Sequence, residues 1–225
     1  MASASPSPTA RAGAAPELSF SVEDASALEH AAAPTLRFGL RIETDASARV
    51  RSILLHTQVQ IAARRRRYEA GEEERLFELF GEPQRFASTL RTLPWTRQTQ
   101  VVPPFTGDAA VDVLVPCTYD FEVAASRYLH ALDEGTVPLE LLFSGTLFYA
   151  GEGGLLQTAQ IAWDREAEYA LPVSVWRDTM DRYFPDTAWL RLRTETFERL
   201  HAYRSRRALT SWEDAIEALL REGSG

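Results

Sequence analysis

The sequence of 225 residues has no lysine, a single cysteine and no apolar run long enough to cross a membrane. All 24 basic residues are therefore arginine, a bias that we attribute to a GC-rich genome. One cysteine cannot form an internal disulfide, which favours a reducing compartment. The longest apolar stretch, residues 137–150, contains Glu140 and is shorter than the about 20 residues of a spanning helix. No apolar segment follows the first residues, so we expect no secretory signal and a cytoplasmic location.

Motifs for catalysis and metal binding are also lacking. No histidine has a cysteine or histidine neighbour at ligand spacing, and neither HExxH nor CxxC occurs. Residues 151–154 are rich in glycine but lack the Lys-Ser/Thr of a phosphate loop, which predicts a hairpin turn. The sequence therefore predicts no catalytic residue, no metal and no cofactor, in a protein that is not an enzyme. An enzyme with scattered catalytic residues is the alternative. The four histidines are His30, His56, His130 and His201.

Alternation of apolar and polar residues is the strongest signal that is present. From Val111 to Val123 every second residue is apolar, and Cys117 belongs to that apolar set. We therefore expect a buried, inert thiol and not a nucleophile. One-faced alternation of this kind is typical of antiparallel sheets. Further strands are predicted at residues 17–23, 36–43, 53–61, 98–102, 139–149 and 155–163, of which 139–149 is apolar on both faces and therefore central.

Helical periodicity appears between and after these strands. Two short insertions are predicted at Glu72–Phe80 and Pro83–Arg91, and a helix is predicted between Asp120 and Gly135. The last fifty residues predict helices over 174–184, 196–207 and 211–221, the last preceded by a capping box from Thr210 to Glu213. Residues 189–193 fit either a short strand or the start of a helix.

These patterns predict an α+β fold, a twisted antiparallel sheet or sandwich of about six or seven strands with C-terminal helices packed on it. Residues 1–16 consist mainly of alanine, serine and proline, and we expect a disordered N-terminal tail because they cannot bury enough apolar surface. Residues 17–170 are predicted to form an antiparallel β domain with helical insertions. Residues 171–221 are predicted to form a C-terminal helical segment.

The charge distribution favours a protein partner. The net charge of −8 argues against general nucleic-acid binding, whereas residues 187–209 carry six arginines and two glutamates among aromatic residues. Arginine and aromatic side chains often anchor protein interfaces. The run Arg64–Arg67, which precedes four glutamates, predicts local pairing, protection of a strand edge or a docking patch. We expect a protein partner and no membrane, and leave a homo-oligomer open. The candidate partner-binding residues are Arg64, Arg65, Arg66, Arg67, Trp176, Trp189, Arg191, Arg193, Tyr203, Arg206 and Arg207.

The C-terminal part has the pattern Trp176…Phe184-Pro185…Trp189-Leu190…Phe197…Leu200…Tyr203…Trp212…Ala215…Leu219-Leu220. By this pattern, the chain from Leu18 to Leu220 resembles an uncharacterised actinobacterial family of unknown function. Members of that family are encoded among the accessory genes of high-affinity NiFe-hydrogenases. The resemblance implies a non-enzymatic accessory role in hydrogenase assembly or complex formation, and it assigns no catalytic residue.

Two partial resemblances imply alternative functions. Residues 18–148 are similar in layout to the SecB export chaperone, through Val22-Glu-Asp-Ala-Ser26, two long strands, Cys117, a helix and Pro138-Leu-Glu-Leu141. This similarity implies that the protein holds unfolded clients, although SecB has neither the insertion at about 71–106 nor the C-terminal part. Residues 188–221 resemble a ribbon-helix-helix antitoxin, which implies a DNA-binding regulator with Arg191 and Arg193 facing the major groove.

Overall fold

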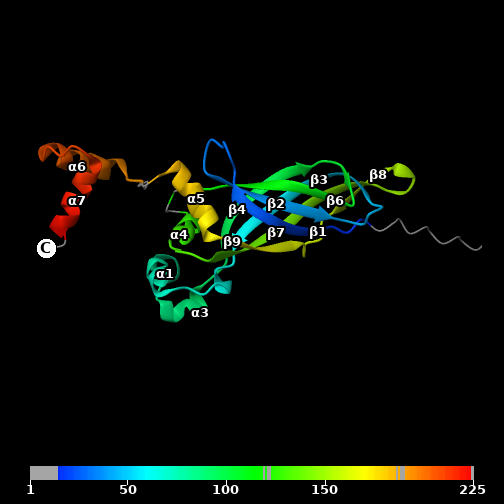
Figure 1. Cartoon of the computed structure of the whole chain (residues 1–225), viewed down its shortest axis with the longest axis horizontal. Helices are drawn as coiled ribbons and strands as arrows, with labels where there is room; N and C mark the ends of the chain where they lie inside the picture. The colour runs from blue at the N-terminus through cyan, green and yellow to red at the C-terminus, as the bar shows by residue number, and fades with distance from the viewer. Residues whose placement is uncertain (1–14, 119, 121–122, 186, 188–190, 224–225) are drawn as a thin grey trace, which may run out of the picture. The chain divides into compact units, whose positions relative to one another are not determined.

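The computed structural model describes residues 15–118, 120, 123–185, 187 and 191–223. The nine strands in these residues form one antiparallel sheet that folds into two facing layers (Figure 1). The predicted α+β class and antiparallel sandwich are confirmed, with more strands than the six or seven predicted. The predicted disordered tail lies, over residues 1–14, outside the described residues. One layer contains β1 (Ser19–Ala27), β2 (Thr35–Glu43) and β6 (Asp108–Pro116); the other contains β3 (Arg49–Ile61), β4 (Leu93–Val102), β7 (Thr136–Ala150), β8 (Leu156–Gln160) and β9 (Glu166–Pro172). The short strand β5 (Phe105–Thr106) pairs with both β3 and β6 and joins the layers at a corner.

The core lies between the two layers, where the alternating residues of the strands meet. Every second residue of β2 is fully buried, and Phe38 packs edge to face against Trp95 of β4 and Tyr169 of β9, at 6.4 and 6.0 Å between ring centroids. Burying one such side chain contributes about 1.5–3 kcal/mol. The intervening residues face outward, where Arg37 forms ion pairs with two carboxylates, 2.5 and 3.0 Å away. The alternation of apolar and polar residues in β2 therefore determines which side chains are buried in the core and which are exposed to solvent.

The strand β7 is central, as predicted, and a glycine lies where one of its neighbouring strands gives way to another. It pairs with β3 along one edge and, along the other, first with β9 and then with β8. Gly145 lies between the last two pairings with φ of +138°, and a Cβ atom there would be 1.9 Å from the carbonyl oxygen of Leu54. Only glycine fits such a close backbone approach. The strand predicted at 155–163 ends at Gln160 in the structure. The chain then turns through the exposed Trp163 into β9, a strand that was not predicted from the sequence.

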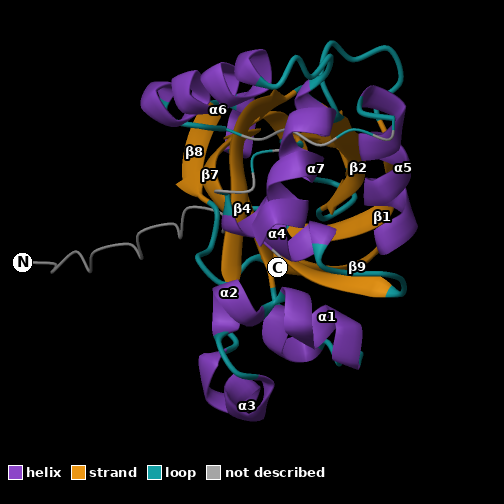
Figure 2. Ribbon diagram, turned by 90° about the vertical axis from the view of Figure 1, so that its left-hand side faces the viewer, coloured by secondary structure: helices purple, strands orange, loops and turns teal. Residues whose placement is uncertain are grey.

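Short helices fill the connection between β3 and β4, which confirms the predicted insertions. Their aromatic residues Phe80 and Phe86 pack with Tyr68 and with Tyr128 of α4 (Ala124–His130), at 6.0–6.3 Å between ring centroids. The helices α1, α2 and α3 lie together at one end of the sheet (Figure 2). The insertion contains η1 (Ala63–Arg65), α1 (Ala70–Arg75), α2 (Phe77–Phe80), η2 (Pro83–Arg85) and α3 (Phe86–Thr89).

The helix predicted between Asp120 and Gly135 is shorter in the structure, where α4 ends at His130. The carbonyl groups of Leu132 and Glu134 accept hydrogen bonds from arginine side chains, so the chain leaves the helix here. Cys117 is buried before α4, as predicted, and burial raises the pKa of its thiol to about 12. A thiol of this kind is a poor nucleophile at neutral pH. The predicted turn between β7 and β8 is confirmed as η3 (Glu152–Gly154).

The chain divides into two compact units, Met1–Thr187 and Ala188–Gly225. The predicted helix after β9 is confirmed as α5 (Val173–Tyr183), which belongs to the first unit and packs against β1, β2 and β9. The second unit contains α6 (Thr194–Arg206) and α7 (Trp212–Gly223), as predicted. No helix in the described part of the chain is long and apolar enough to span a membrane.

The predicted capping box of the last helix is wrong by one residue. The helix begins at Trp212, so the cap position is Ser211 and not Thr210. The Asp214 amide donates to the Ser211 hydroxyl at 3.0 Å, and the Ser211 amide donates to the Asp214 carboxylate at 3.1 Å. This reciprocal pair satisfies two amides at the start of the helix.

Candidate partner-binding site

The two helices of the second unit are held together by an aromatic and ionic contact. Trp212 of α7 packs against Phe197 of α6, with 5.1 Å between ring centroids, and the Arg204 guanidinium lies 3.9 Å from the Trp212 ring centroid. Arg207, directly after α6, forms an ion pair at 2.5 Å with Glu222 in the last turn of α7. Hydrogen bonds from Ser211 and from the Thr210 hydroxyl lower the pKa of the Asp214 carboxyl. These contacts fix the hairpin of α6 and α7.

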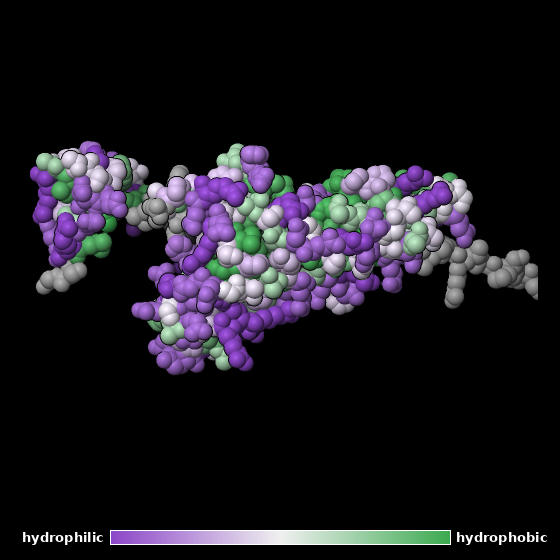
Figure 3. All heavy atoms as spheres, viewed as in Figure 1, coloured by the Kyte–Doolittle hydropathy of each residue, from purple (hydrophilic) through white to green (hydrophobic). Residues whose placement is uncertain are grey.

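The hairpin leaves much of its apolar surface uncovered. Among the described residues of α6 and α7, only Ala215 is buried. Leu219 and Leu220 are 40% and 65% exposed, and Ile216 is 38% exposed. Figure 3 shows hydrophobic atoms gathered beside α7 among otherwise hydrophilic ones. The contacts between α6 and α7 therefore leave this apolar face uncovered, and exposed apolar patches of this kind mark interaction sites.

These apolar side chains line a groove of about 620 Å³. The residues from α6 and the segment before it are Leu192, Thr196, Arg199, Leu200, Ala202, Tyr203 and Arg206, and those from α7 are Ile216, Leu219 and Leu220. The only charged side chains of the lining are the two arginines, and no ion pair is formed by either one within the described residues. The groove is therefore apolar along its length and positive along its α6 side.

Three of the predicted partner-binding residues lie together on this hairpin. Tyr203 and Arg206 line the groove. The Arg207 guanidinium lies 4.8 Å from the Tyr203 ring centroid and forms the ion pair with Glu222 of α7. Arg199 also lines the groove but was not among the predicted partner-binding residues. Its position seven residues before Arg206, two helical turns away, is the signal that could have identified it.

The other predicted C-terminal residues are not part of the groove. Arg191 and Arg193 precede α6 and are exposed, and the described residues 191–193 form neither a strand nor a helix. Trp189 lies outside the described residues. Trp176 of α5 is only 4% exposed and packs against His130 in the first unit, so it belongs to the core and does not offer an interface anchor.

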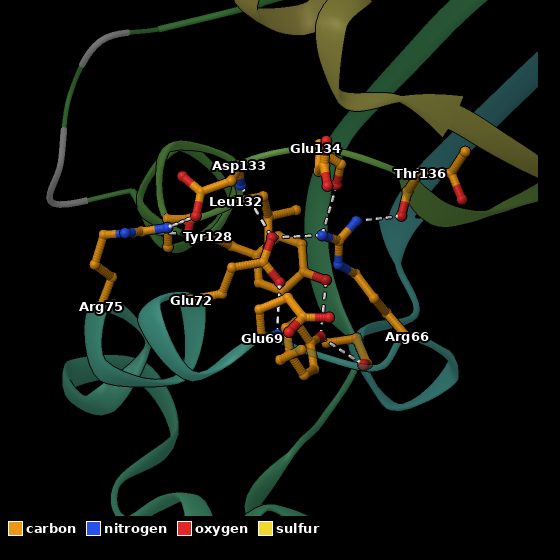
Figure 4. A network of polar contacts seen from close by, with 12 residues as sticks. Arg66, Glu69, Glu72, Arg75, Tyr128, Leu132, Asp133, Glu134 and Thr136 are labelled. Carbon is orange, nitrogen blue, oxygen red and sulfur yellow. Dashed lines mark hydrogen bonds and ion pairs between the residues drawn. The ribbon is translucent and has the colours of Figure 1, made fainter.

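In the predicted arginine patch, Arg66 is turned into the protein, whereas Arg64, Arg65 and Arg67 are exposed. Arg66 is 10% exposed and forms an ion pair with the buried Glu72 at 2.5 Å. It also donates hydrogen bonds to the carbonyl groups of Glu134, at 2.8 Å, and Thr136, at 2.7 Å (Figure 4). The Glu72 oxygen that pairs with Arg66 also accepts a hydrogen bond from the Asp133 amide at 2.9 Å, and the other carboxylate oxygen accepts from the Glu69 amide at 3.2 Å. This network ties the insertion to the loop before β7.

The neighbours of Arg66 in the run are also held by internal partners. Arg65 forms ion pairs with Glu140 and Glu168, at 2.9 and 2.5 Å, and Arg64 donates a hydrogen bond to the Leu90 carbonyl. Arg67 is exposed. Three of the four arginines therefore follow the local-pairing interpretation, and a docking role for the run stays a prediction.

A second hollow, of about 520 Å³, lies beside this network. Its lining contains three arginines, at 65–67, and four carboxylates, which are Glu69, Glu72, Asp133 and Glu134. Positive and negative side chains therefore mix in this lining, and Arg66 and Glu72 already pair with each other, so the hollow has no field of one sign to attract a charged ligand. Within the described residues, no group of three or more His, Cys, Asp or Glu side chains is arranged to hold a metal ion. The groove on the hairpin is therefore the stronger candidate site.

Comparison with protein families gives a match over nearly the whole chain. The model of DUF6084, a family of unknown function, matches residues 15–225. The chain belongs to this family. No protein of curated function matches the chain.

Solved structures similar to this DUF6084 chain are distant. The ApaA protein from Bordetella pertussis is 14% identical, with 69% of this chain and 93% of that chain covered and a TM-score of 0.24. The β-glucosidase 3B from Thermotoga neapolitana is 12% identical, with 69% and 17% covered and a TM-score of 0.25. The β-glucosidase from Kluyveromyces marxianus is 9% identical, with 69% and 15% covered and a TM-score of 0.23. At these scores, the likenesses carry no argument about the function of the DUF6084 chain.

Proposed function

We propose that this DUF6084 protein is a non-enzymatic protein-binding accessory factor, and that the hairpin of α6 and α7 binds its partner. The observation that carries the proposal is the open apolar groove on a unit with a single buried residue among its described helical positions. Apolar surface of this extent is costly to leave in water, and a partner that covers it gains that free energy.

The proposed pathway is the assembly or complex formation of NiFe-hydrogenases. Its support is the resemblance carried by the C-terminal sequence pattern, which includes the groove residues Leu200, Tyr203, Leu219 and Leu220. The same residues therefore support both the accessory role and the place of contact. A protein with this role needs a docking surface and no reaction centre.

The experiment is an affinity capture from the native organism with three versions of the full chain. The first is the wild type, the second is the groove variant Leu219→Glu/Leu220→Glu, and the third is Leu155→Glu/Leu156→Glu. The third is a matched control, because these leucines are also adjacent and are 71% and 65% exposed in the other unit. Hydrogenase subunits or maturation proteins should be enriched with the wild type and the control, and at least about tenfold less with the groove variant.

Two outcomes would contradict the proposal. If all three versions capture the partner equally, the groove is not the binding site. If the captured proteins include no hydrogenase subunit or maturation protein, the proposed role in hydrogenase assembly is wrong. Suppression of aggregation of unrelated unfolded proteins would favour the SecB-like alternative instead. Salt-dependent DNA binding that is lost in Arg191→Ala/Arg193→Ala would favour the regulator.

A further inference from the structure

The groove has the length and the form of a site for one helix. Its α6 side is built from positions 196, 199, 200, 203 and 206, which repeat every three or four residues and form one face of the helix. Ten residues of helix rise about 15 Å, or nearly three turns. Its α7 side repeats in the same way through Ile216, Leu219 and Leu220. A helix laid between two helices can bury an apolar stripe at this spacing, whereas an extended peptide would find no strand edge to pair with.

The charge of the groove indicates which kind of helix fits. Arg199 and Arg206 are two turns apart on α6 and point to the same groove, while no carboxylate lines it. Neither arginine forms an ion pair within the described part of the hairpin, in contrast to Arg207, which pairs with Glu222. A partner with carboxylates about two turns apart beside its apolar stripe would complement both arginines.

We infer that the occupant of the groove is an amphipathic α-helix of a partner protein that carries acidic residues along one side of its apolar stripe. This inference rests on the proposed function and names the chemistry of the partner. Apolar burial supplies most of the affinity, and the two ion pairs supply selectivity. Partly exposed pairs of this kind change affinity by about 2- to 30-fold when two act together.

A second copy of this chain fits the groove less well. A symmetric dimer that used this surface would bring the same surface of both copies together. Four arginines, Arg199 and Arg206 from each copy, would then enter one interface to which the groove lining contributes no carboxylate. Like charges in a closing interface oppose association. The charge pattern therefore favours a different chain with the opposite sign.

The test measures the binding of two labelled, end-capped peptides of 18 residues to the full chain by fluorescence anisotropy. Both peptides carry leucines at i, i+3, i+4 and i+7, flanked by glutamates seven residues apart in one and by lysines in the other. The wild type should bind the glutamate peptide at least about threefold more tightly than the lysine peptide. The variant Arg199→Glu/Arg206→Glu should reverse this preference, and salt should weaken it in both proteins.

The control variant is Arg91→Glu/Arg221→Glu, which changes the net charge equally at two exposed positions outside the groove lining. It should keep the preference of the wild type. A preference that survives the groove reversal, or that the control also reverses, would overturn the inference. A dimer in analytical ultracentrifugation that dissociates in Leu219→Glu would overturn it in favour of a second copy.

Failure of the inference is distinguishable from failure of the proposed function. If neither peptide binds, but capture of hydrogenase proteins still depends on Leu219 and Leu220, the groove binds a partner of another chemistry and only the inference is wrong. If the peptides bind with the expected reversal but no hydrogenase protein is captured, the inference that the groove binds an acidic helix is supported. The proposed role in hydrogenase assembly is then wrong.

Discussion

Breaking the buried ion pair between Arg66 and Glu72 should be among the most destabilising polar changes in the first unit. The Glu72 side chain is 2% exposed, and that of Arg66 is 10% exposed. In Glu72→Gln the guanidinium stays buried without its carboxylate, and in Arg66→Met the carboxylate stays buried without its cation. Removing one partner of a buried pair costs about 3–5 kcal/mol, because the other charge is left without compensation.

The loss of stability in each variant depends on which hydrogen bonds remain for the buried groups. Without Arg66, the carbonyl groups of Glu134 and Thr136 lose donors, while Glu72 keeps the amides of Glu69 and Asp133. For a chain of this length, 1 kcal/mol shifts the midpoint of thermal unfolding by about 2–4 °C. Each single variant should therefore unfold about 6–20 °C below the wild type.

The assay is urea and thermal unfolding of the two single variants and of Arg66→Met/Glu72→Gln, followed by circular dichroism and by fluorescence. The double variant should lose at least about 1 kcal/mol less than the two single losses combined, because the two side chains interact directly. Arg41→Met is the control, since Arg41 also contacts three carboxylates but is 41% exposed, and it should remain close to the wild type. Additive losses, or a control as unstable as Arg66→Met, would refute the reasoning.

Three further changes test other parts of the structure. Burial raises the pKa of Cys117 to about 12, so its thiol should react with a disulfide reagent at pH 8 at least about 1,000-fold more slowly in the native chain than in urea; a difference below tenfold would show an accessible thiol. Gly145→Ala should cost at least about 2 kcal/mol more than Gly153→Ala, because its Cβ would meet the Leu54 carbonyl, whereas Gly153 faces open space; equal losses in urea would contradict the close approach. Ser211→Ala removes the cap of α7 and should cost about 0.5–2 kcal/mol, seen as lower ellipticity at 222 nm on heating, and an unchanged melt would place the cap elsewhere.

The sandwich could be predicted from sequence because its strands have one buried and one exposed face. The alternation through Leu36, Phe38, Leu40 and Ile42 corresponds to four fully buried side chains. The strand β9 has the same alternation in Ala167, Tyr169 and Leu171, but it is short and contains alanine, so its signal is weak. What fixes β9 is its pairing with β7, and single-strand periodicity carries no information about neighbours.

The environment of each arginine could not be predicted from the run Arg64–Arg67. Arg66 turns inward because the carbonyl groups of Glu134 and Thr136 and the carboxylate of Glu72 converge there, and two of these lie about 70 residues away along the chain. The aromatic C-terminal residues present the same problem. Trp176 and Trp212 both lie on amphipathic helices. Trp176 is buried in the core of the first unit, whereas Trp212 packs against Phe197 between α6 and α7.

Only part of the groove could be predicted from the sequence. The positions on α6 follow from helical spacing, and Tyr203 and Arg206 were among the predicted partner-binding residues. Whether α7 would cover that face or leave it open depends on where Trp212 packs and on the turn between the helices. These are three-dimensional contacts, so exposure of the apolar face could not be derived from composition.

The pairing of β2 with β6 has a consequence for how the chain is made. Leu36 of β2 pairs with Val115 of β6. The strands β3 and β4 and the whole insertion between them are therefore synthesised before β6, the second neighbour of β2 in the sheet. Only β1 is available to it earlier, and a two-stranded ribbon is marginally stable at best. Contacts so distant along the chain slow folding, and nascent strands with unpaired edges invite aggregation. We therefore expect the unpaired edge of β2 to need protection on the ribosome until residue 116 has emerged, and its apolar face until Tyr169 of β9 has also emerged and can pack against Phe38.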